Sequence, residues 1–204
     1  MANPTPATLP SRAEALALLH EYTASDSLRK HMLAVESAMR AYADRFGEDA
    51  ERWGLAGLMH DFDYERFPNA AKSPTDEHPA YGVGVLRERG WPEDILQAIL
   101  GHATYSGVPR ETLMAKTLFA VDELTGLITA TALVRPTKSV HEVDAESVRK
   151  KMKKKEFARG VNRDDIVAGA QELGVELDAH IQFVIDAMRG VAGSLGLAGT
   201  SADG

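Results

Sequence analysis

The sequence contains no cysteine, which excludes disulfides and thiolate-bound metals. Any bound metal must therefore be held by histidine and carboxylate side chains. The chain also lacks an apolar run long enough to cross a bilayer, and its first residues, MANPTPATLPSR, contain no hydrophobic signal core. These absences predict a soluble, cytoplasmic protein without membrane association.

The features of a nucleic-acid-binding protein are also scarce. The formal net charge is −7 and there are 2 tryptophans, which argues against general binding to nucleic acid. One run, RKKMKKK at 149–155, is strongly basic, but no aromatic residues are interleaved with it. Nucleic acid is therefore not expected as a partner, and nothing in the sequence predicts the oligomeric state.

Helical periodicity dominates the chain and no alternating strand pattern occurs, so the sequence predicts an all-α fold. With 204 residues and 44% hydrophobic content, the chain can bury one core. We expect a tail and first helix over 1–26, a core bundle over 27–136, and a helical extension packed on it over 137–204. The expected helices are 11–22, 27–46, 49–61, 78–90, 92–102, 111–134, 145–155, 163–173 and 177–195.

Four histidines and two aspartates lie on the apolar faces of these helices. For example, Asp122 lies four residues after Leu118, a spacing that places both on one helix face. Taken singly, an inward histidine more often bonds to a carbonyl than to a metal. Burying six such groups in one core is costly, however, and bound cations would offset that cost. The set is His31, His60, Asp61, His78, His102 and Asp122.

Three further histidines have no such companions. His20 ends the first expected helix, His141 lies in a polar loop, and His180 lies in a late helix without a matching set. We interpret these three as structural or exposed residues.

The order of the six residues resembles the H…HD…D signature of the HD superfamily of metal-dependent phosphohydrolases. His31, the adjacent His60 and Asp61, and Asp122 match this signature. The other two histidines resemble the extra pair of its two-metal branch, which includes cyclic dinucleotide phosphodiesterases, a diadenosine tetraphosphate hydrolase and mixed-valent diiron oxygenases. The whole chain also resembles a family of small predicted HD hydrolases. This resemblance implies a helical HD-domain bundle with the metal site in its core, but it does not identify the substrate.

The resemblance further implies two divalent metal ions bridged by Asp61, with a hydroxide that attacks phosphorus. Iron and manganese suit the donor set best, and zinc, cobalt or nickel are alternatives. The expected substrate is small and phosphorylated or nucleotide-like. An HD-type diiron oxygenase and a non-catalytic metal-binding or ligand-sensing module are the rival functions. The family pattern assigns one ion to His31, His60 and Asp122, and the other to His78 and His102.

The residues after the HD pair depart from the HD-x-G-K motif of many phosphodiesterases, because Phe62, Asp63 and Tyr64 stand there. The lysine that stabilises substrate charge is therefore missing at that position. Asp63 could be a general acid or base or could orient a ligand histidine, and Tyr64 could bond a substrate oxygen. The alternative is a solvated carboxylate and a packing tyrosine. We expect Asp61, Asp63 and Tyr64 to take part in catalysis.

The basic residues after Asp122 are the candidates for holding phosphate. We expect one or more cationic side chains of the run 149–155 to face the metals as a mobile lid. The alternative is a solvated helical face. The chain also lacks the HHExxxGxGYP block of cyclic-di-GMP phosphodiesterases, so that activity is not expected. The predicted substrate-binding residues are Arg135, Lys138, Lys150, Lys151 and Arg163.

Overall fold

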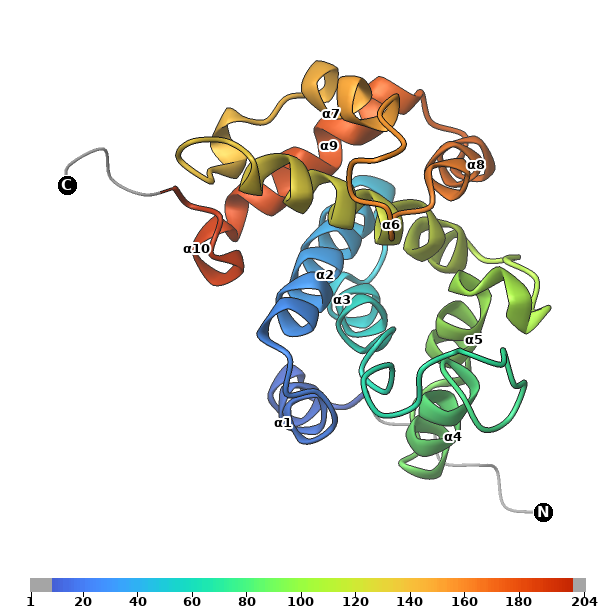
Figure 1. Ribbon diagram of the computed structural model, residues 1–204. Coiled ribbons are helices and arrows are strands. Elements are labelled where there is room, and N and C mark those ends of the chain that lie inside the picture. Colours follow the sequence, from blue (N-terminus) through green and yellow to red (C-terminus); the bar gives the residue numbers. More distant parts are fainter. Residues whose placement is uncertain (1–8, 200–204) are drawn as a thin grey trace, which may run out of the picture.

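The computed structural model describes residues 9–199, which form ten α-helices and two short 3-10 helices, with no β-strand among them (Figure 1). The all-α prediction is confirmed. No helix in this range has both the length and the apolar character needed to span a bilayer. The helices are α1 (Arg12–Tyr22), α2 (Asp26–Phe46), α3 (Ala50–Met59), α4 (Ala80–Glu88), α5 (Glu93–His102), η1 (Thr104–Ser106), α6 (Leu113–Leu133), η2 (Val140–Glu142), α7 (Ala145–Met152), α8 (Arg163–Leu173), α9 (Leu177–Gly190) and α10 (Ala192–Leu195).

Helix boundaries follow the sequence signals closely at some ends and depart from them at others. A capping box starts α1, because the side chains of Ser11 and Glu14 each accept a bond from the other residue's backbone N–H. The last predicted helix, in contrast, is divided at Val191 into α9 and α10. The basic helix α7 ends at Met152, so the lysines that follow it are outside the helix.

Two glycines let α3 pack closely against α2. A Cβ atom at Gly57 would lie 3.0 Å from backbone atoms of Glu36, and one at Gly54 would lie 2.6 Å from the guanidinium of Arg40. Because both distances are shorter than ordinary van der Waals contacts, larger residues would separate the helices. The two helices contribute His31 and the end at Met59 to the same interior, so their close packing positions the predicted metal ligands.

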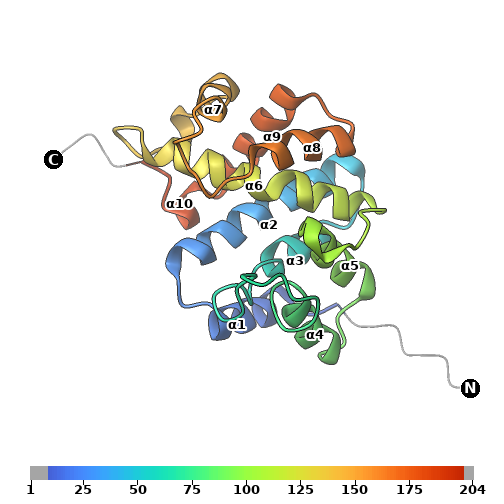
Figure 2. The same cartoon turned by 45° about the vertical axis from the view of Figure 1, so that its right-hand side comes forward.

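The C-terminal helices cover α6 from the side away from α3 (Figure 2). Helix α8 packs on α6 so closely that a Cβ at Gly169 would lie 2.5 Å from the Cα of Ala120. Helix α9 contacts both α6 and α2. The start of α8 is thereby brought beside the part of α6 that carries Asp122.

A buried polar chain joins three of these helices. The hydroxyl of Tyr42 on α2 donates to Nδ1 of His180 on α9, at 2.6 Å, and Nε2 of His180 donates to the carbonyl of Ala120 on α6, at 3.0 Å. Burial lowers the pKa of His180, which keeps the imidazole neutral, and raises the pKa of Tyr42 to about 12. His180 is therefore a structural residue.

We predict that Tyr42→Phe destabilises the fold, because it leaves Nδ1 of His180 as a buried acceptor without a donor. The free energy of unfolding, measured by urea denaturation at pH 7, should fall by about 1–3 kcal/mol. Tyr22→Phe is the matched control, since the half-buried Tyr22 ring packs against Phe62. That variant should change stability by less than about 0.5 kcal/mol. Equal losses in the two variants would contradict the role assigned to the buried chain.

Candidate metal centre

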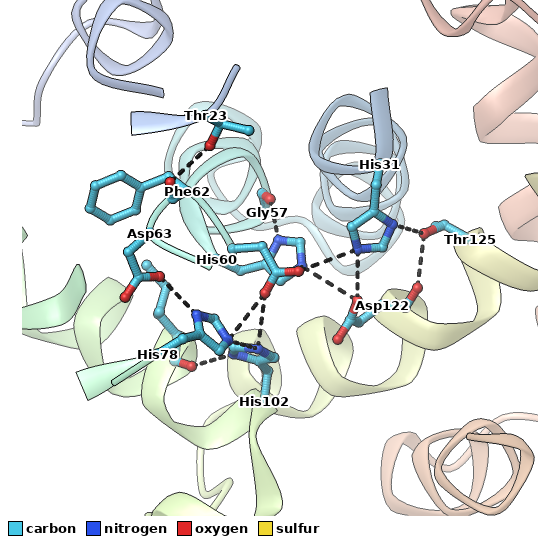
Figure 3. A network of polar contacts seen from close by, with 12 residues as sticks. Thr23, His31, Gly57, His60, Phe62, Asp63, His78, His102, Asp122 and Thr125 are labelled. Atoms are coloured by element: carbon cyan, nitrogen blue, oxygen red, sulfur yellow. Dashed lines mark hydrogen bonds and ion pairs between the residues drawn. The ribbon is translucent and has the colours of Figure 1, made fainter. Parts of the chain in front are cut away.

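The six residues predicted to bind metal lie together in the centre of the bundle (Figure 3). They come from five separate segments, so only the folded chain assembles them. Their side chains form two groups, and within each group the potential ligand atoms lie within 4.8 Å of one another. The first group is His31 on α2, His60 just after α3 and Asp122 on α6; the second is Asp61 just after α3, His78 before α4 and His102 at the end of α5.

The carboxylate of Asp61 faces both groups at once. Its Oδ1 lies 3.2 Å from Nε2 of His78 and 3.5 Å from Nε2 of His102. Its Oδ2 lies 3.5 Å from Nε2 of His60 and 3.8 Å from Nε2 of His31. One side chain therefore presents one oxygen to each group, which is the arrangement of a bridging carboxylate between two ions.

Two of the histidines are oriented by the helix ends they follow. Nδ1 of His60 donates to the carbonyl of Gly57, at 2.8 Å, and Nδ1 of His102 donates to the carbonyl of Ile99. The last carbonyls of a helix lack intrahelical donors, so these bonds also satisfy the ends of α3 and α5. With Nδ1 engaged, Nε2 of each ring is directed into the site.

Asp63 orients a third histidine rather than facing the cavity. Its Oδ1 accepts from Nδ1 of His78 at 2.8 Å, and its Oδ2 accepts from the backbone N–H of Gly82 at 2.7 Å. Asp63 is 1% exposed, and a Cβ at Gly82 would lie 2.5 Å from its Cγ. Of the two roles expected from the sequence, this geometry matches orientation of a ligand histidine, not proton transfer to substrate.

The fourth histidine is oriented by α6 itself. The hydroxyl of Thr125 donates to the carbonyl of Asp122, at 2.8 Å. The same hydroxyl oxygen can therefore accept from Nδ1 of His31, which lies 3.4 Å away. Nε2 of His31 then lies 3.0 Å from Oδ1 of Asp122. All four imidazoles therefore turn Nε2 toward the two carboxylates.

The facing Nε2 atoms fit a site for cations. Nε2 of His78 and Nε2 of His102 lie 3.2 Å apart. With both Nδ1 atoms donating and both rings in the neutral form that binds metal, each Nε2 presents a lone pair to the other. Nε2 of His60 is fully buried and makes no well-aligned hydrogen bond among residues 9–199, although Oδ1 of Asp122 lies 3.3 Å away. Facing lone pairs repel unless a cation lies between them. Imidazole and carboxylate donors are those that transition-metal ions take, so the residues fit such ions.

Opposite charges hold the carboxylates of the centre in their ionised forms. Burial alone would raise the pKa of Asp61, but the imidazoles of His60 and His78 lower it well below its usual range. Burial likewise opposes the ionisation of Asp122, and His60 and His31 lower its pKa. Burial lowers the pKa of His60, but the two carboxylates outweigh that effect and raise it to about 9. Protons and metal ions therefore compete for the same Nε2 atom.

A cavity of about 670 Å³ opens beside both groups. Tyr64 lies at its edge, 38% exposed, with its ring edge-on to His78 at 5.2 Å. Burial and then the charge of Asp122 raise the pKa of the lining residue Glu123 to about 7. Besides the metal-binding groups, the polar residues that line the cavity are Tyr64, Asn69, Lys72, Thr104, Tyr105, Glu123, Asn162 and Asp165.

None of the predicted phosphate-binding residues, all of which lie within 9–199, lines this cavity. Lys150 pairs with Glu146 at 2.7 Å, and Arg149 pairs with Asp178 at 3.0 Å. The lid therefore stays a prediction, and in this structure neighbouring carboxylates and exposure to solvent surround the basic run. The predicted residues that do not line the cavity are Arg135, Lys138, Arg149, Lys150, Lys151, Lys153, Lys154, Lys155 and Arg163.

Arg163 has a structural task instead of contacting substrate. Its guanidinium donates to the carbonyls of Phe157, Ala158 and Val161, at 2.9 Å for Ala158. These bonds hold the segment that brings Gly160 to the cavity wall. The positive charge is used to stabilise a loop, so it is not available to a substrate phosphate.

Sequence reasoning missed Lys72, the one lysine or arginine that lines the cavity; every such residue of the chain lies within 9–199. Lys72 lies in the loop before α4, with its Nζ 5.6 Å from the ring centroid of Tyr105. The hydroxyl of Tyr105 accepts from Asn69 at 2.9 Å and donates to the carbonyl of His78 at 2.8 Å. A loop has no periodicity to show which way its side chains point, so the sequence contained no signal for this residue.

The family comparison agrees with the geometry of the centre. Residues 28–127 match the family model of the HD domain. This match supports the HD superfamily. The matched residues 28–127, here called the HD-domain segment, contain all six residues of the two groups. No curated protein and no solved structure matches the chain. Asn162 and Asp165 of the cavity wall lie outside the HD-domain segment.

We predict that Asp63→Asn weakens metal binding at one group of the candidate metal centre. The amide cannot accept from both His78 and Gly82, so the imidazole loses its fixed orientation. Affinity of the group that contains His78 should fall about 10–100-fold, measured by titrating the metal-free protein with manganese. The Gly82→Ala variant should act in the same direction, because its methyl group would displace Asp63.

The control is Asp76→Asn, the same change at an exposed carboxylate of the same loop. This variant should bind manganese with the same affinity and stoichiometry as the unmodified protein. If Asp63→Asn bound both ions with unchanged affinity, Asp63 would have no part in positioning His78.

Proposed function

We propose that the protein is a metal-dependent phosphohydrolase that cleaves a phosphoester or phosphoanhydride bond of a small phosphorylated substrate. The observation that carries this proposal is the carboxylate of Asp61, which presents one oxygen to each of two histidine-containing groups beside an open cavity. The HD-domain match supports it, because HD domains are generally found in metal-dependent hydrolases.

The donor set would hold two divalent transition-metal ions, for which iron and manganese are the best candidates. When bound, such ions supply a hydroxide at neutral pH and positive charge that stabilises the phosphoryl oxygens. The residues that would hold them are His31, His60 and Asp122 for one ion, His78 and His102 for the other, and Asp61 for both.

The chain's own residues orient this centre and bind the substrate. Asp63 and the helix-end carbonyls fix the imidazoles, so that the donor atoms are in place before substrate arrives. Lys72 would donate to a phosphoryl oxygen as a point charge, which gives it the part of the lysine missing after the HD pair. Tyr64 would contact a substrate oxygen from the edge of the cavity. In the reaction, a water oxygen bonds to phosphorus, the bond to the leaving oxygen breaks, and that oxygen takes up a proton.

The direct test is hydrolysis without oxygen. Protein purified anaerobically and loaded with manganese should release inorganic phosphate from p-nitrophenyl phosphate. Asp61→Ala is the matched variant, since it removes the one carboxylate that faces both groups. Its metal content should fall from two ions per chain to one or none, and hydrolysis should fall about 10²–10³-fold.

Two results would overturn the proposal. Activity restricted to iron-loaded protein, with consumption of oxygen, would favour an oxygenase. A protein that binds two ions but hydrolyses no phosphorylated compound in a substrate screen would favour a metal-binding or ligand-sensing module.

A second prediction concerns the cation of the cavity. Lys72→Gln removes the single ammonium group in the lining, so the Michaelis constant for p-nitrophenyl phosphate should rise about tenfold, the loss of about one charge-assisted hydrogen bond. Metal content should not change. Lys150→Gln is the control, because Lys150 pairs with Glu146 away from the cavity, and it should leave the constant unchanged. If Lys150→Gln raised the Michaelis constant and Lys72→Gln did not, the basic run and not Lys72 would contact the phosphate.

A further inference from the structure

The cavity carries opposite charges at its two ends, apart from the metal-binding groups. Lys72 lies at the end near His78, because both contact Tyr105. Glu123 and Asp165 line the other end, where Glu123 follows Asp122 on α6. His78 and Asp122 lie on opposite sides of the site in Figure 3.

One residue holds both carboxylates in place. The backbone N–H of Asn162 donates to Oε2 of Glu123 at 3.1 Å, and Nδ2 of Asn162 donates to Oδ2 of Asp165 at 2.6 Å. The side-chain oxygen of Asn162 caps the first turn of α8. Asn162 is therefore fixed by the helix it begins, and it engages one oxygen of each carboxylate.

Among residues 9–199, neither carboxylate forms an ion pair with a protein side chain, and Lys72, the single lysine or arginine of the lining, lies at the other end of the cavity. Arg110 acts on Asp165 through its charge, but its guanidinium makes two hydrogen bonds to Glu172, at 2.8 and 2.6 Å. Half-buried carboxylates without an ion-pair partner in contact with them are costly to desolvate. A ligand that supplies positive charge at this end of the cavity would lower that cost.

We infer that the substrate is a phosphate monoester whose leaving group carries a protonated amine. The phosphate would lie at the metal-binding groups beside Lys72, and the ammonium group would lie between Glu123 and Asp165. This inference rests on the proposed function, since it places the phosphate at the metal centre. It goes further by naming the chemical class of the leaving group.

The chemistry of the two ends favours this class over others. An ammonium group has three N–H donors and no acceptor, so it suits two carboxylate oxygens that Asn162 leaves free. A second phosphate or another anionic group would face like charge there. A neutral hydroxyl could donate only one hydrogen bond and would leave the carboxylates without a counter-charge. The volume of about 670 Å³ is ample for a small molecule of this kind.

The experiment compares two substrates of nearly equal size with manganese-loaded protein. In 2-aminoethyl phosphate the leaving group ends in an ammonium group, and in 2-hydroxyethyl phosphate it ends in a hydroxyl. We expect kcat/KM to be at least about tenfold higher for the amine, which corresponds to about 1.4 kcal/mol. Asp165→Asn and Glu123→Gln should each bring this ratio close to one.

The matched control is Asp164→Asn, the same change at the neighbouring, exposed residue, which does not line the cavity. This variant should keep the preference for the amine.

p-Nitrophenyl phosphate is assayed beside both substrates to separate the two proposals. If it is hydrolysed but the amine is no better than the hydroxyl compound, the inference is wrong and the phosphohydrolase stands. If no compound is hydrolysed, both fail. A higher kcat/KM for 2-hydroxyethyl phosphate would also contradict the inference, and it would indicate that this end of the cavity binds a neutral leaving group.

Discussion

The placement of six ionisable side chains, three buried and three half-buried, in one core is the constraint on which the rest of the structure depends. Each imidazole would be costly to bury without a partner for both of its nitrogens. The chain meets this need on the Nδ1 side with a carboxylate, a threonine hydroxyl and two helix-end carbonyls. The Nε2 atoms are directed into the centre, where a bound ion would contact them. The helix-end carbonyls and the buried Asp63 hold Nδ1 atoms, and the close packing of α3 on α2 keeps His31 and His60 near each other.

The architecture was largely predictable from the sequence. Apolar periodicity and capping signals identified the helices, and the start of α1 at the capping box of Ser11 and Glu14 is an example. Some helix ends differ from those expected from the sequence, because tertiary contacts override local preference. The lysine run continues the helical pattern past Met152, but the chain leaves the helix there and Phe157 packs against the core. The position of Val191, where one predicted helix becomes two, had no signal in composition.

The candidate site was predictable where periodicity applies. A residue on a helix face has a direction that its spacing reveals, and for this reason the six metal-binding candidates were found and lie together. The orientation of Asp63 and the position of Lys72 depend on turns and loops, for which spacing gives no direction. The partners of the basic run could not be predicted, because its charge is visible in the sequence, whereas residues such as Glu146 and Asp178 become its neighbours only in the folded chain.

The cavity wall is divided between two parts of the chain. The HD-domain segment provides the two groups that could hold metal, and Asn162 and Asp165, which lie beyond it, shape the end of the cavity where the leaving group of the proposed substrate would lie. Because Asn162 begins α8 and reaches back to α6 with a single backbone bond, substitutions around it need not disturb the buried imidazoles. In evolutionary terms, the cavity wall and the two groups can vary independently, since selection would act on them through different residues.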